Sequence, residues 1–405
     1  MNKYINKDEY LVDNGKCYVG IHLENKNSSL SGYDFSIIIR DSIFDLFPTC
    51  KLSIKDSSFR LNEYRAFVNG TPLQVFLDTS DDKWIGLPLV VDENSTPQQL
   101  KQGEVGGNIE LKCVHEFWYK QEKLKQSFND NISNIIKKIA NKYKFKSVDI
   151  DNTTNKGLWL QPSMTDSEFI INNLLPFCYN VSSQDSPFYC FIDSDNIFHL
   201  KSLFKMTTQK PVVELSYSNN NVDDENAILS ISPLQTSAKI LKDDYVRNFN
   251  KFDENGVYTP SDESVYLINY PKRENKVMYR ADMKLLSKDL LTYVDSDFIN
   301  EEDENNEKGY EINSIRNKVY MDKIIITLNL NRKLKSGQVV KINIPIKNKD
   351  GQESSSISYN GTYLIESSIH RWDNVSKFAS TTLVCSKQST NLSMKYLNKE
   401  KMAKV

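Results

Sequence analysis

Short runs of alternating apolar and polar residues, each ended by turn residues, dominate two parts of this chain. From Tyr33 to about Cys113 the runs include YDFSIIIRDSIF, CKLSIKDSS and GGNIELKCVHEFW. From Tyr310 they include KVYMDKIIITLNLNRKLKSGQVVKINIPIKN. Alternation with a period of two places one face of a strand in a core, and Asn69-Gly70 supplies a favoured hairpin turn. Both parts are therefore predicted to be antiparallel β-barrels or sandwiches.

The pattern changes near Ser127, where apolar residues recur three and four positions apart in SFNDNISNIIKKIANKYKFK. This spacing predicts one amphipathic helix whose apolar stripe packs on a core. The stripe consists of Phe128, Ile132, Ile135, Ile136, Ile139 and Tyr143.

A second helix is predicted to begin at TDSEFIINNLLPFCYN, because Thr165 and Glu168 have the spacing of a capping box. Pro176 should end or kink it. The segment PFYCFIDSDNIFHLKSL then alternates like a hairpin with its tip at Asp193 to Asn196. Together these elements predict a small α+β domain.

The fold class is therefore mainly β with α+β, with two tube-like antiparallel β-barrel domains around a small middle domain. The first barrel is assigned to residues 1–113, the middle domain to 114–209 and the second barrel to 210–387, with an insertion at about 247–309. The insertion ends in the acidic run DSDFINEEDENNEKG, whose mutual repulsion predicts a solvated loop. A site for cations or a basic partner is the alternative. Residues 388–405 form a basic tail.

A duplication is suggested by two glycines followed by apolar residues at the same offsets. Leu73, Val75 and Leu77 follow Gly70, and Val340, Ile342 and Ile344 follow Gly337. Each segment is later followed by a histidine with an aromatic residue close behind, in HEFW at His115 and in HRW at His370. Either the pattern is a coincidence common among β proteins, or the chain holds two related barrels.

Charge and targeting signals narrow the classes of function. With 51 basic and 53 acidic residues the formal net charge is −2, so no global positive field is expected to hold nucleic acid or an anionic membrane. The start, MNKYINKDEY, is polar, and no stretch approaches the ~20 apolar residues that span a bilayer. Synthesis in a cytoplasm without stable membrane insertion is expected. The six cysteines form no CxxC pair and are expected to be reduced.

Motifs for catalysis or for metal and cofactor binding are absent from the sequence. The four histidines, His22, His115, His199 and His370, show no HExxH or His-x-His spacing, and no GxSxG or GxxxxGK occurs. We therefore expect no enzyme activity, cofactor or metal. Two alternatives stay open, a cell-wall hydrolase with a carboxylate pair and a carbohydrate-binding β module. His370 is expected to be a strand-end residue with a satisfied hydrogen bond, on a face where its ring can meet water or an interface, and an intersubunit contact is the main alternative.

Four segments in order resemble phage baseplate hub proteins, a family that includes the first part of type VI secretion spike proteins. The segment SIIIRDSIFDLFPTCKLSIKDSS resembles the opening motif of this family, with Arg40, Asp41 and Ser42 in one strand and Asp56 ending the next. TDSEFIINNLLPFCY is similar to the middle-domain helix, and LKSGQVVKINIP to the strand before the closing hairpin. GTYLIESSIH and TTLVCSK resemble that hairpin.

The resemblance implies a structural virion protein of a contractile-tail baseplate. Such a protein would be a trimer that adapts a sixfold tail tube to a threefold central spike, here expected as a separate chain. Its expected partners are the tail tube protein, the spike, the tape measure protein and the baseplate wedge proteins, with transient passage of DNA through its channel during genome ejection. The structural or interface residues carried over are Arg40, Asp41, Ser42, Asp56, His115, Trp118, Gly337, Gly361, His370 and Trp372.

Overall fold

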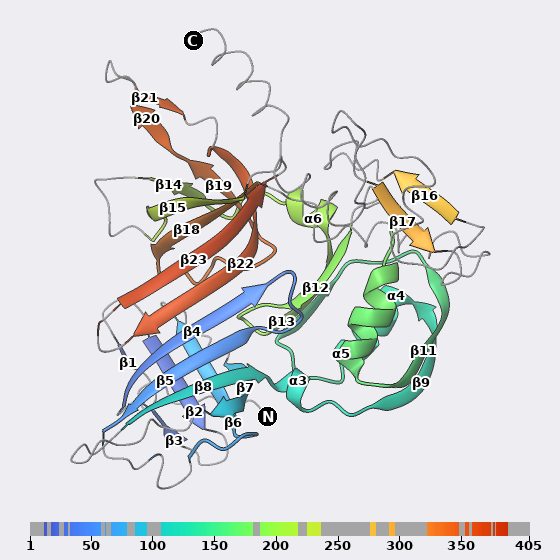
Figure 1. Ribbon diagram of the computed structural model, residues 1–405, viewed down its shortest axis with the longest axis horizontal. Helices are drawn as coiled ribbons and strands as arrows, with labels where there is room; N and C mark the ends of the chain where they lie inside the picture. Colours follow the sequence, from blue (N-terminus) through green and yellow to red (C-terminus); the bar gives the residue numbers. More distant parts are fainter. Residues whose placement is uncertain are drawn as a thin grey trace, which may run out of the picture.

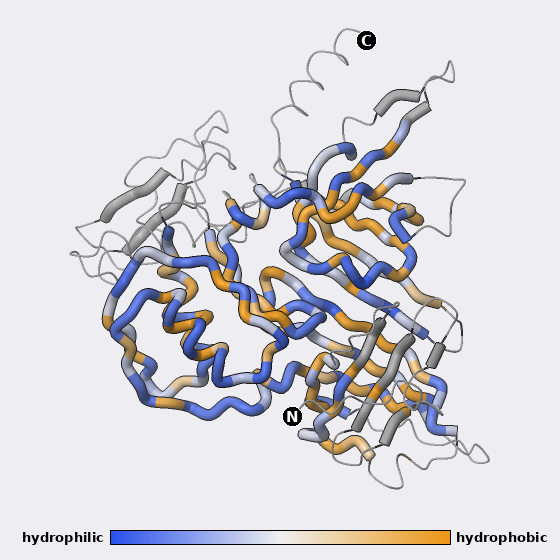
Figure 2. Tube along the Cα trace, turned by 180° about the vertical axis from the view of Figure 1, so that it is seen from behind, coloured by the Kyte–Doolittle hydropathy of each residue, from blue (hydrophilic) through white to orange (hydrophobic). Residues whose placement is uncertain are grey.

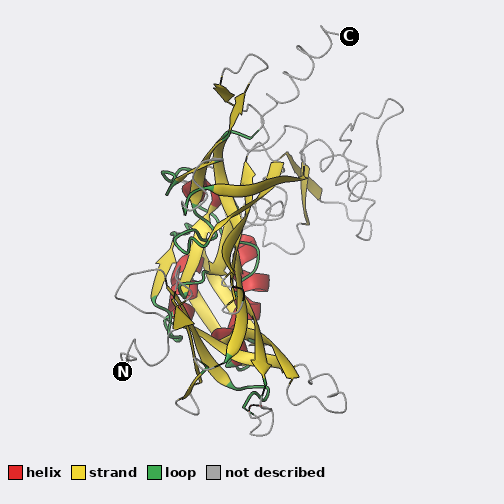
Figure 3. Cartoon of the chain, turned by 90° about the vertical axis from the view of Figure 1, so that its left-hand side faces the viewer, coloured by secondary structure: helices red, strands yellow, loops and turns green. Residues whose placement is uncertain are grey.

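One long β-sheet runs through the molecule, and a smaller α+β part packs beside it (Figure 1). The computed structural model describes residues 12–13, 18–23, 28–30, 33–57, 61, 66–78, 86–94, 107–180, 187–217, 225–235, 276–280, 291–295, 322–347, 353–355, 359–373, 376 and 378–387. Strands extend along the whole length of the molecule, with the helices near its middle (Figure 3). The predicted fold class, mainly β with α+β, is confirmed.

The first half of the sheet has antiparallel neighbours throughout, in the order β1-β2-β6-β7-β8-β5-β4, with β3 paired to β2. Alternate side chains face one core, as in β4, where Phe35, Ile37 and Ile39 are buried. The strands are β1 Val12–Asp13, β2 Tyr18–Leu23, β3 Ser28–Ser29, β4 Asp34–Ser42, β5 Thr49–Asp56, β6 Pro72–Asp78, β7 Leu87–Asn94 and β8 Gly107–His115.

The second half has the order β22-β23-β18-β15, with β19 paired to the start of β22 and β14 paired to β19. Its strands are β14 Glu214–Ser216, β15 Ile228–Gln235, β18 Asp322–Asn329, β19 Val339–Asn343, β22 Gly361–Asp373 and β23 Phe378–Lys387. Two separate ribbons are formed by β16 Lys276–Arg280 with β17 Leu291–Asp295 and by β20 Pro345–Lys347 with β21 Glu353–Ser355.

The two halves repeat one topology. In chain order, β4, β5, β6, β7 and β8 take the sheet order β4-β5-β8-β7-β6, and β15, β18, β19, β22 and β23 take the matching order β15-β18-β23-β22-β19. The glycine pattern has a physical cause, because Gly70 (φ +88°) and Gly337 (φ +81°) both have a positive φ. Each N–H donates a 2.8 Å bond, to the carbonyl of Val91 and of Ile365, and a β-bulge follows each acceptor. The duplication is confirmed at the level of topology.

The two histidines proposed as part of the repeat are not equivalent. His115 ends β8, whose counterpart in the second half is β23. His370 lies inside β22, which corresponds to β7 and continues to Asp373. This part of the sequence interpretation was wrong, since a shared dipeptide does not report the position of a residue in a strand.

The halves are joined by antiparallel pairing of β4 with the second part of β22, from Ser42 opposite Ser367 to Ser36 opposite Asp373. Figure 1 shows these strands side by side at the centre of the sheet. Among the described residues the path of paired strands begins at β1 and ends at β15 without closing. Closure into two barrels stays a prediction.

The middle part of the chain carries its own core of helix and strand side chains. Ile132, Ile135, Ile136 and Ile139 of α4 are all buried in it. The elements are α3 Glu116–Tyr119, β9 Leu124–Asn131, α4 Ile132–Ala140, β10 Ser147–Ile150, β11 Lys156–Met164, α5 Asp166–Glu168, a π-helical turn Phe169–Leu174, a 3-10 turn Leu175–Phe177, β12 Phe188–Ile192, β13 Ile197–Ser202 and α6 Leu203–Thr207.

The predicted helix from Ser127 begins later than the periodicity indicated. Phe128 lies in β9, opposite Trp159 of β11, and the helix starts only after Asn131, which has an extended backbone. Pairing with β11 therefore overrides the helical spacing at its first position. The second prediction is confirmed, because Thr165 and Glu168 form a reciprocal capping box. The hairpin β12–β13 turns at residues 193–196, as predicted.

Four clusters of buried apolar side chains hold the parts together, and Figure 2 shows hydrophobic segments in each part of the chain. Each half of the sheet has one cluster and the middle part has another. The fourth contains Ile43, Tyr189, Val339 and Leu364, and so lies where all three parts meet. The domain boundaries stay a prediction, and the acidic run 298–308 and the tail 388–405 lie outside the described residues. None of the described helices is long and apolar enough to cross a membrane.

Candidate functional site

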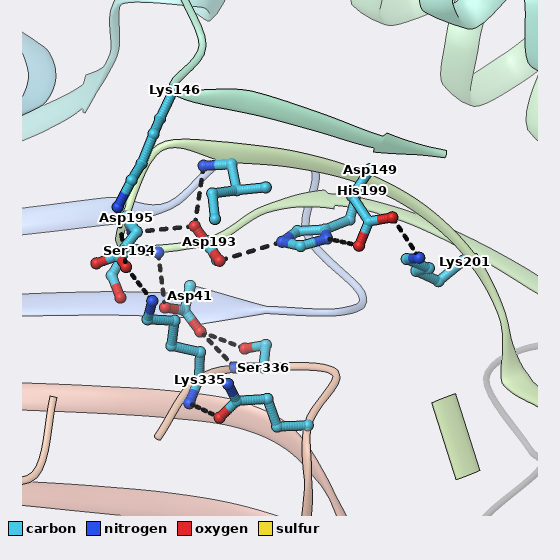
Figure 4. A network of polar contacts seen from close by, with 12 residues as sticks. Asp41, Lys146, Asp149, Asp193, Ser194, Asp195, His199, Lys201, Lys335 and Ser336 are labelled. Atoms are coloured by element: carbon cyan, nitrogen blue, oxygen red, sulfur yellow. Dashed lines mark hydrogen bonds and ion pairs between the residues drawn. The ribbon is translucent and has the colours of Figure 1, made fainter. Parts of the chain in front are cut away.

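Asp41 lies where the three parts of the chain meet, and it is almost completely buried. In β4 the side chains of Ile37, Ile39 and Asp41 point the same way, so the alternation that builds the core also carries the carboxylate inward. Its oxygens accept four hydrogen bonds, and Figure 4 shows those from Ser194 and Ser336. The donors are the Ser194 N–H at 3.0 Å, the Ser336 N–H at 3.1 Å, the Ser336 hydroxyl and the Ser368 hydroxyl at 2.9 Å.

These donors join three separate segments to β4. Ser194 lies in the turn between β12 and β13, Ser336 precedes β19, and Ser368 lies in β22. Burial raises the pKa of Asp41, and the nearby Asp193 raises it further, while the bonds from Ser336 and Ser368 oppose the shift. A buried carboxylate is costly unless it is hydrogen-bonded, so these contacts replace the lost water. The site is a polar joint of the fold.

Asp195 forms a second link between the middle part and the second half of the sheet. Its carboxylate contacts Arg332 Nη2 at 2.9 Å. It also contacts the Lys335 ammonium and Lys146 Nζ, the latter at 3.7 Å (Figure 4). Burial alone would raise the pKa of Asp195, but the charges of Arg332, Lys335 and Lys146 outweigh it, and the pKa is lowered. Arg332 and Lys335 are themselves mostly buried, so this ion-pair cluster is screened less than a surface pair.

His199 is fixed between two carboxylates in the same region (Figure 4). Its Nε2 lies 3.1 Å from Asp193 and its Nδ1 lies 3.6 Å from Asp149, which also pairs with Lys201 at 2.5 Å. Burial lowers the pKa of His199, but the hydrogen bonds to Asp149 and Asp193 and the negative charges of these residues outweigh burial, so the pKa is raised. A histidine held between two carboxylates in this way is a structural link between the strands that carry them.

His370 is buried in the middle of β22 rather than at a strand end. Its Nδ1 lies 3.1 Å from the Thr381 hydroxyl and its Nε2 lies 3.4 Å from the Ser368 hydroxyl. Burial, together with the charges of Arg332 and Lys335, lowers its pKa to about 3. The expectation of a strand end was wrong, because β22 continues to Asp373, and the ring is buried rather than facing water, whereas the expected hydrogen bond is present.

His115 is also buried, at the end of β8. Its Nδ1 accepts the Phe117 N–H at 3.1 Å, so the proton must be on Nε2, which donates to the Asn196 side-chain oxygen at 2.9 Å. Burial lowers the pKa of His115 to about 4, against the bond to Asn196. This histidine ties the first half of the sheet to the β12–β13 turn.

The other residues singled out from the sequence are spread over the molecule. Arg40 is exposed and contacts Asp45 at 3.7 Å, and the Ser42 hydroxyl accepts the Phe44 N–H. Gly337 lies beside the joint, and a Cβ added there would come within 2.7 Å of Phe191. The remaining four lie elsewhere: Asp56, buried at the end of β5; Trp118, exposed on α3; Gly361, at the start of β22; and Trp372, buried against Phe35.

The sequence reasoning missed the partners of Asp41, which are Ser194, Ser336 and Ser368, and it missed the neighbouring carboxylates of Asp193 and Asp195. The tip of the predicted hairpin carries two aspartates, Asp193 and Asp195. Because one such side chain is enough to cap a turn, the second was a usable signal of a contact with another part of the chain. Within the described ranges, no cluster of His, Cys, Asp or Glu side chains is arranged to hold a metal ion. The five cysteines there are all buried: Cys50, Cys113, Cys178, Cys190 and Cys385.

Comparisons with known proteins identify solved structures with a similar fold. No protein-family model and no curated protein matches the sequence. A tail protein from Neisseria meningitidis MC58 is similar in structure, with a TM-score of 0.51, 11% identity, and 92% of this chain and 97% of that chain covered. The 43 kDa tail protein of prophage MuSo2 from Shewanella oneidensis has a TM-score of 0.52 and 11% identity over 91% of this chain and 97% of that one.

A component of the type VI secretion system of E. coli also matches, with a TM-score of 0.45, 9% identity, and 91% of this chain and 77% of that chain covered. The chain therefore has the fold of phage tail proteins, and the resemblance seen in the sequence is confirmed at the level of the fold.

Proposed function

We propose that this protein is a structural component of a contractile-tail baseplate, a trimeric hub between the sixfold tail tube and a threefold spike. It acts by assembly and force transmission and has no catalytic role. Its partners are then the tube protein, a separate spike chain, the tape measure protein and the wedge proteins, and DNA passes transiently through its channel. The shared fold of tail proteins supports this proposal, and one feature of the sheet carries it.

That feature is the junction between the two halves. The outer edge of β4, the first strand of the first repeat, pairs with β22 of the second repeat. The equivalent of β4 in the second repeat is β15, which pairs only with β18 among the described strands. The equivalent of β22 is β7, and its residues Glu93 and Asn94 pair only with β8 in the described part.

The same junction can therefore form again between two copies. If β15 of one copy pairs with β7 of the next, as β4 pairs with β22 within the chain, each copy adds two equivalent units to a ring. Head-to-tail contacts of this kind close into rings. Three copies give six near-equivalent units for a sixfold neighbour and retain threefold symmetry for the spike. Pairing also removes an open strand edge, which natural proteins rarely leave uncovered.

Light scattering coupled to size-exclusion chromatography tests the proposal. We expect a mass about three times the 46.8 kDa of the chain, alone or after addition of the spike protein. Leu229 of β15 is 38% exposed, and Leu229→Asp should reduce the mass to that of a monomer by placing a charge at the new contact. Leu158 of β11 is 68% exposed and far from this edge in sequence and sheet, so Leu158→Asp serves as the matched control.

A monomer that ignores the spike would refute the hub. A trimer equally disturbed by both substitutions would refute the assignment of the edge. Sustained digestion of cell walls by the purified protein, abolished by one Asp or Glu substitution, would support the hydrolase instead.

A further inference from the structure

Two cysteines face each other inside the first half of the sheet. Cys50 of β5 lies directly opposite Cys113 of β8 in their antiparallel register, and Figure 1 shows these strands side by side. Directly opposed residues point to the same face of a sheet, and both side chains are 1% exposed within one apolar core. Both are reduced in this structure. The register therefore brings two thiols together without a covalent bond between them.

The two thiols are in contact. A hydrogen bond between them raises the pKa of Cys50 well above its ordinary value, and burial raises it further. Opposed residues of antiparallel strands have Cα atoms about 4.5 to 5.5 Å apart, and a disulfide accepts about 4.4 to 6.8 Å. The pairing of β5 with β8 therefore holds the backbone at a spacing that a disulfide accepts, and only the side chains need to rotate.

The second half of the sheet has a cysteine at the equivalent position, but it faces an isoleucine. Cys385 corresponds to Cys113, because each is paired with the residue whose carbonyl accepts the N–H of the turn glycine. Across β18, the position of Cys50 is occupied by Ile324. Burial, together with the charge of Glu366, raises the pKa of Cys385. The opposed thiols are thus a property of the first half, and the second half supplies a matched comparison.

We propose that Cys50 and Cys113 form a disulfide when the chain folds in the presence of a small disulfide such as oxidised glutathione. One protein thiolate attacks the oxidant, which forms a mixed disulfide and releases one reduced glutathione. The second protein thiolate attacks the protein sulfur of that bond and releases another. The two electrons and two protons that the protein loses end on the two glutathione molecules. Because both thiols are buried in the finished fold, the exchange takes place while the strands are pairing.

The bond would fasten β5 to β8 and close the chain between them into a loop. A closed loop stabilises a fold mainly by restricting the unfolded chain. Since β5 also pairs with β4, the bond would fasten the strand next to the junction between the two halves. Disulfides persist where the surroundings are oxidising, so the bond would outlast release from a reducing cell. Only this last step rests on the proposed function, in which the protein becomes part of a virion.

Refolding of the full chain tests the proposal. The protein is unfolded in urea with reductant and refolded with reduced and oxidised glutathione, the remaining thiols are blocked with N-ethylmaleimide, and mass spectrometry of the digest maps every disulfide. We expect one peptide pair joined through Cys50 and Cys113, lighter than the separate thiol peptides by two hydrogen atoms. The melting temperature should rise by roughly 5 °C over the reduced form. Synthesis in an oxidising bacterial cytoplasm gives the same measurement without refolding.

Cys50→Ser and Cys113→Ser should each abolish the rise in melting temperature. Cys385→Ser is the matched control and should respond to the oxidant as wild type does, with circular dichroism confirming the fold of each variant. Reduced thiols at both positions, a glutathione adduct on either, or pairing with another cysteine would overturn the proposal. The mass of the same preparation separates this result from the proposed function, because a monomer with the bond refutes only the hub, and a trimer without it refutes only the disulfide.

Discussion

His370 gives the sharpest test of the packing around the middle of β22. In the unfolded chain its pKa is near the ordinary 6.5, whereas in the folded chain it is about 3. Between these values the unfolded state binds a proton that the folded state cannot, so acid favours unfolding. At pH 5, about 1.5 units below 6.5, we expect this histidine to make the free energy of unfolding about 2 kcal/mol lower than at pH 7.5, at roughly 1.36 kcal/mol per pH unit.

The perturbation is His370→Gln, which keeps a polar side chain near Ser368 and Thr381 but does not titrate. Urea unfolding of both proteins is followed by tryptophan fluorescence at pH 7.5 and at pH 5. The free energy of unfolding of wild type minus that of the variant should fall by about 2 kcal/mol on acidification. The stability of the variant at pH 7.5 does not affect the test, since only the change of the difference with pH is compared.

His199 supplies a control of opposite sign. Its folded-state pKa is raised by Asp149 and Asp193, so its contribution to stability is fully present in acid and is lost as the pH rises through the raised value. The wild-type advantage over His199→Gln should therefore grow on acidification. A wild-type advantage over His370→Gln that does not change with pH would refute the burial of His370 in the junction.

Two further substitutions test the joint by thermal and urea unfolding. Gly337→Ala should destabilise the fold by about 2 kcal/mol or more, because φ is +81° and the new Cβ would lie 2.7 Å from Phe191; a cost of about 0.5 kcal/mol or less would contradict this packing. Asp41→Ala should lower the free energy of unfolding by about 3 to 5 kcal/mol, because it leaves four buried donors without their acceptor. A decrease below about 1 kcal/mol would show that the joint does not depend on this carboxylate.

The sequence predicts local structure better than it predicts the joint. Alternation in β4, the capping box at Thr165 and the turn at Asp193 to Asn196 are set by neighbouring residues, and the structure contains all three. The start of α4 was misplaced because a strand partner distant in sequence, β11, decides the conformation of Phe128.

The site depends on contacts between distant segments, which no local pattern encodes. Asp41 was selected by resemblance, but its partner Ser336 lies 295 residues away. His370 was expected near water because a strand pattern cannot say what packs on the face to which its side chain points. Ser368 and Thr381 contact the ring, and the charges of Arg332 and Lys335, from the segment before β19, act on it.

Hydrogen exchange at β15 tests the central claim most directly. If three copies close a ring through this edge, the backbone amides of β15 that face away from β18 should exchange much more slowly in the assembled protein than in dissociated Leu229→Asp. Those of β18, paired on both sides in either state, should not change. Outward amides of β15 that exchange equally fast in both states would contradict the repeated junction.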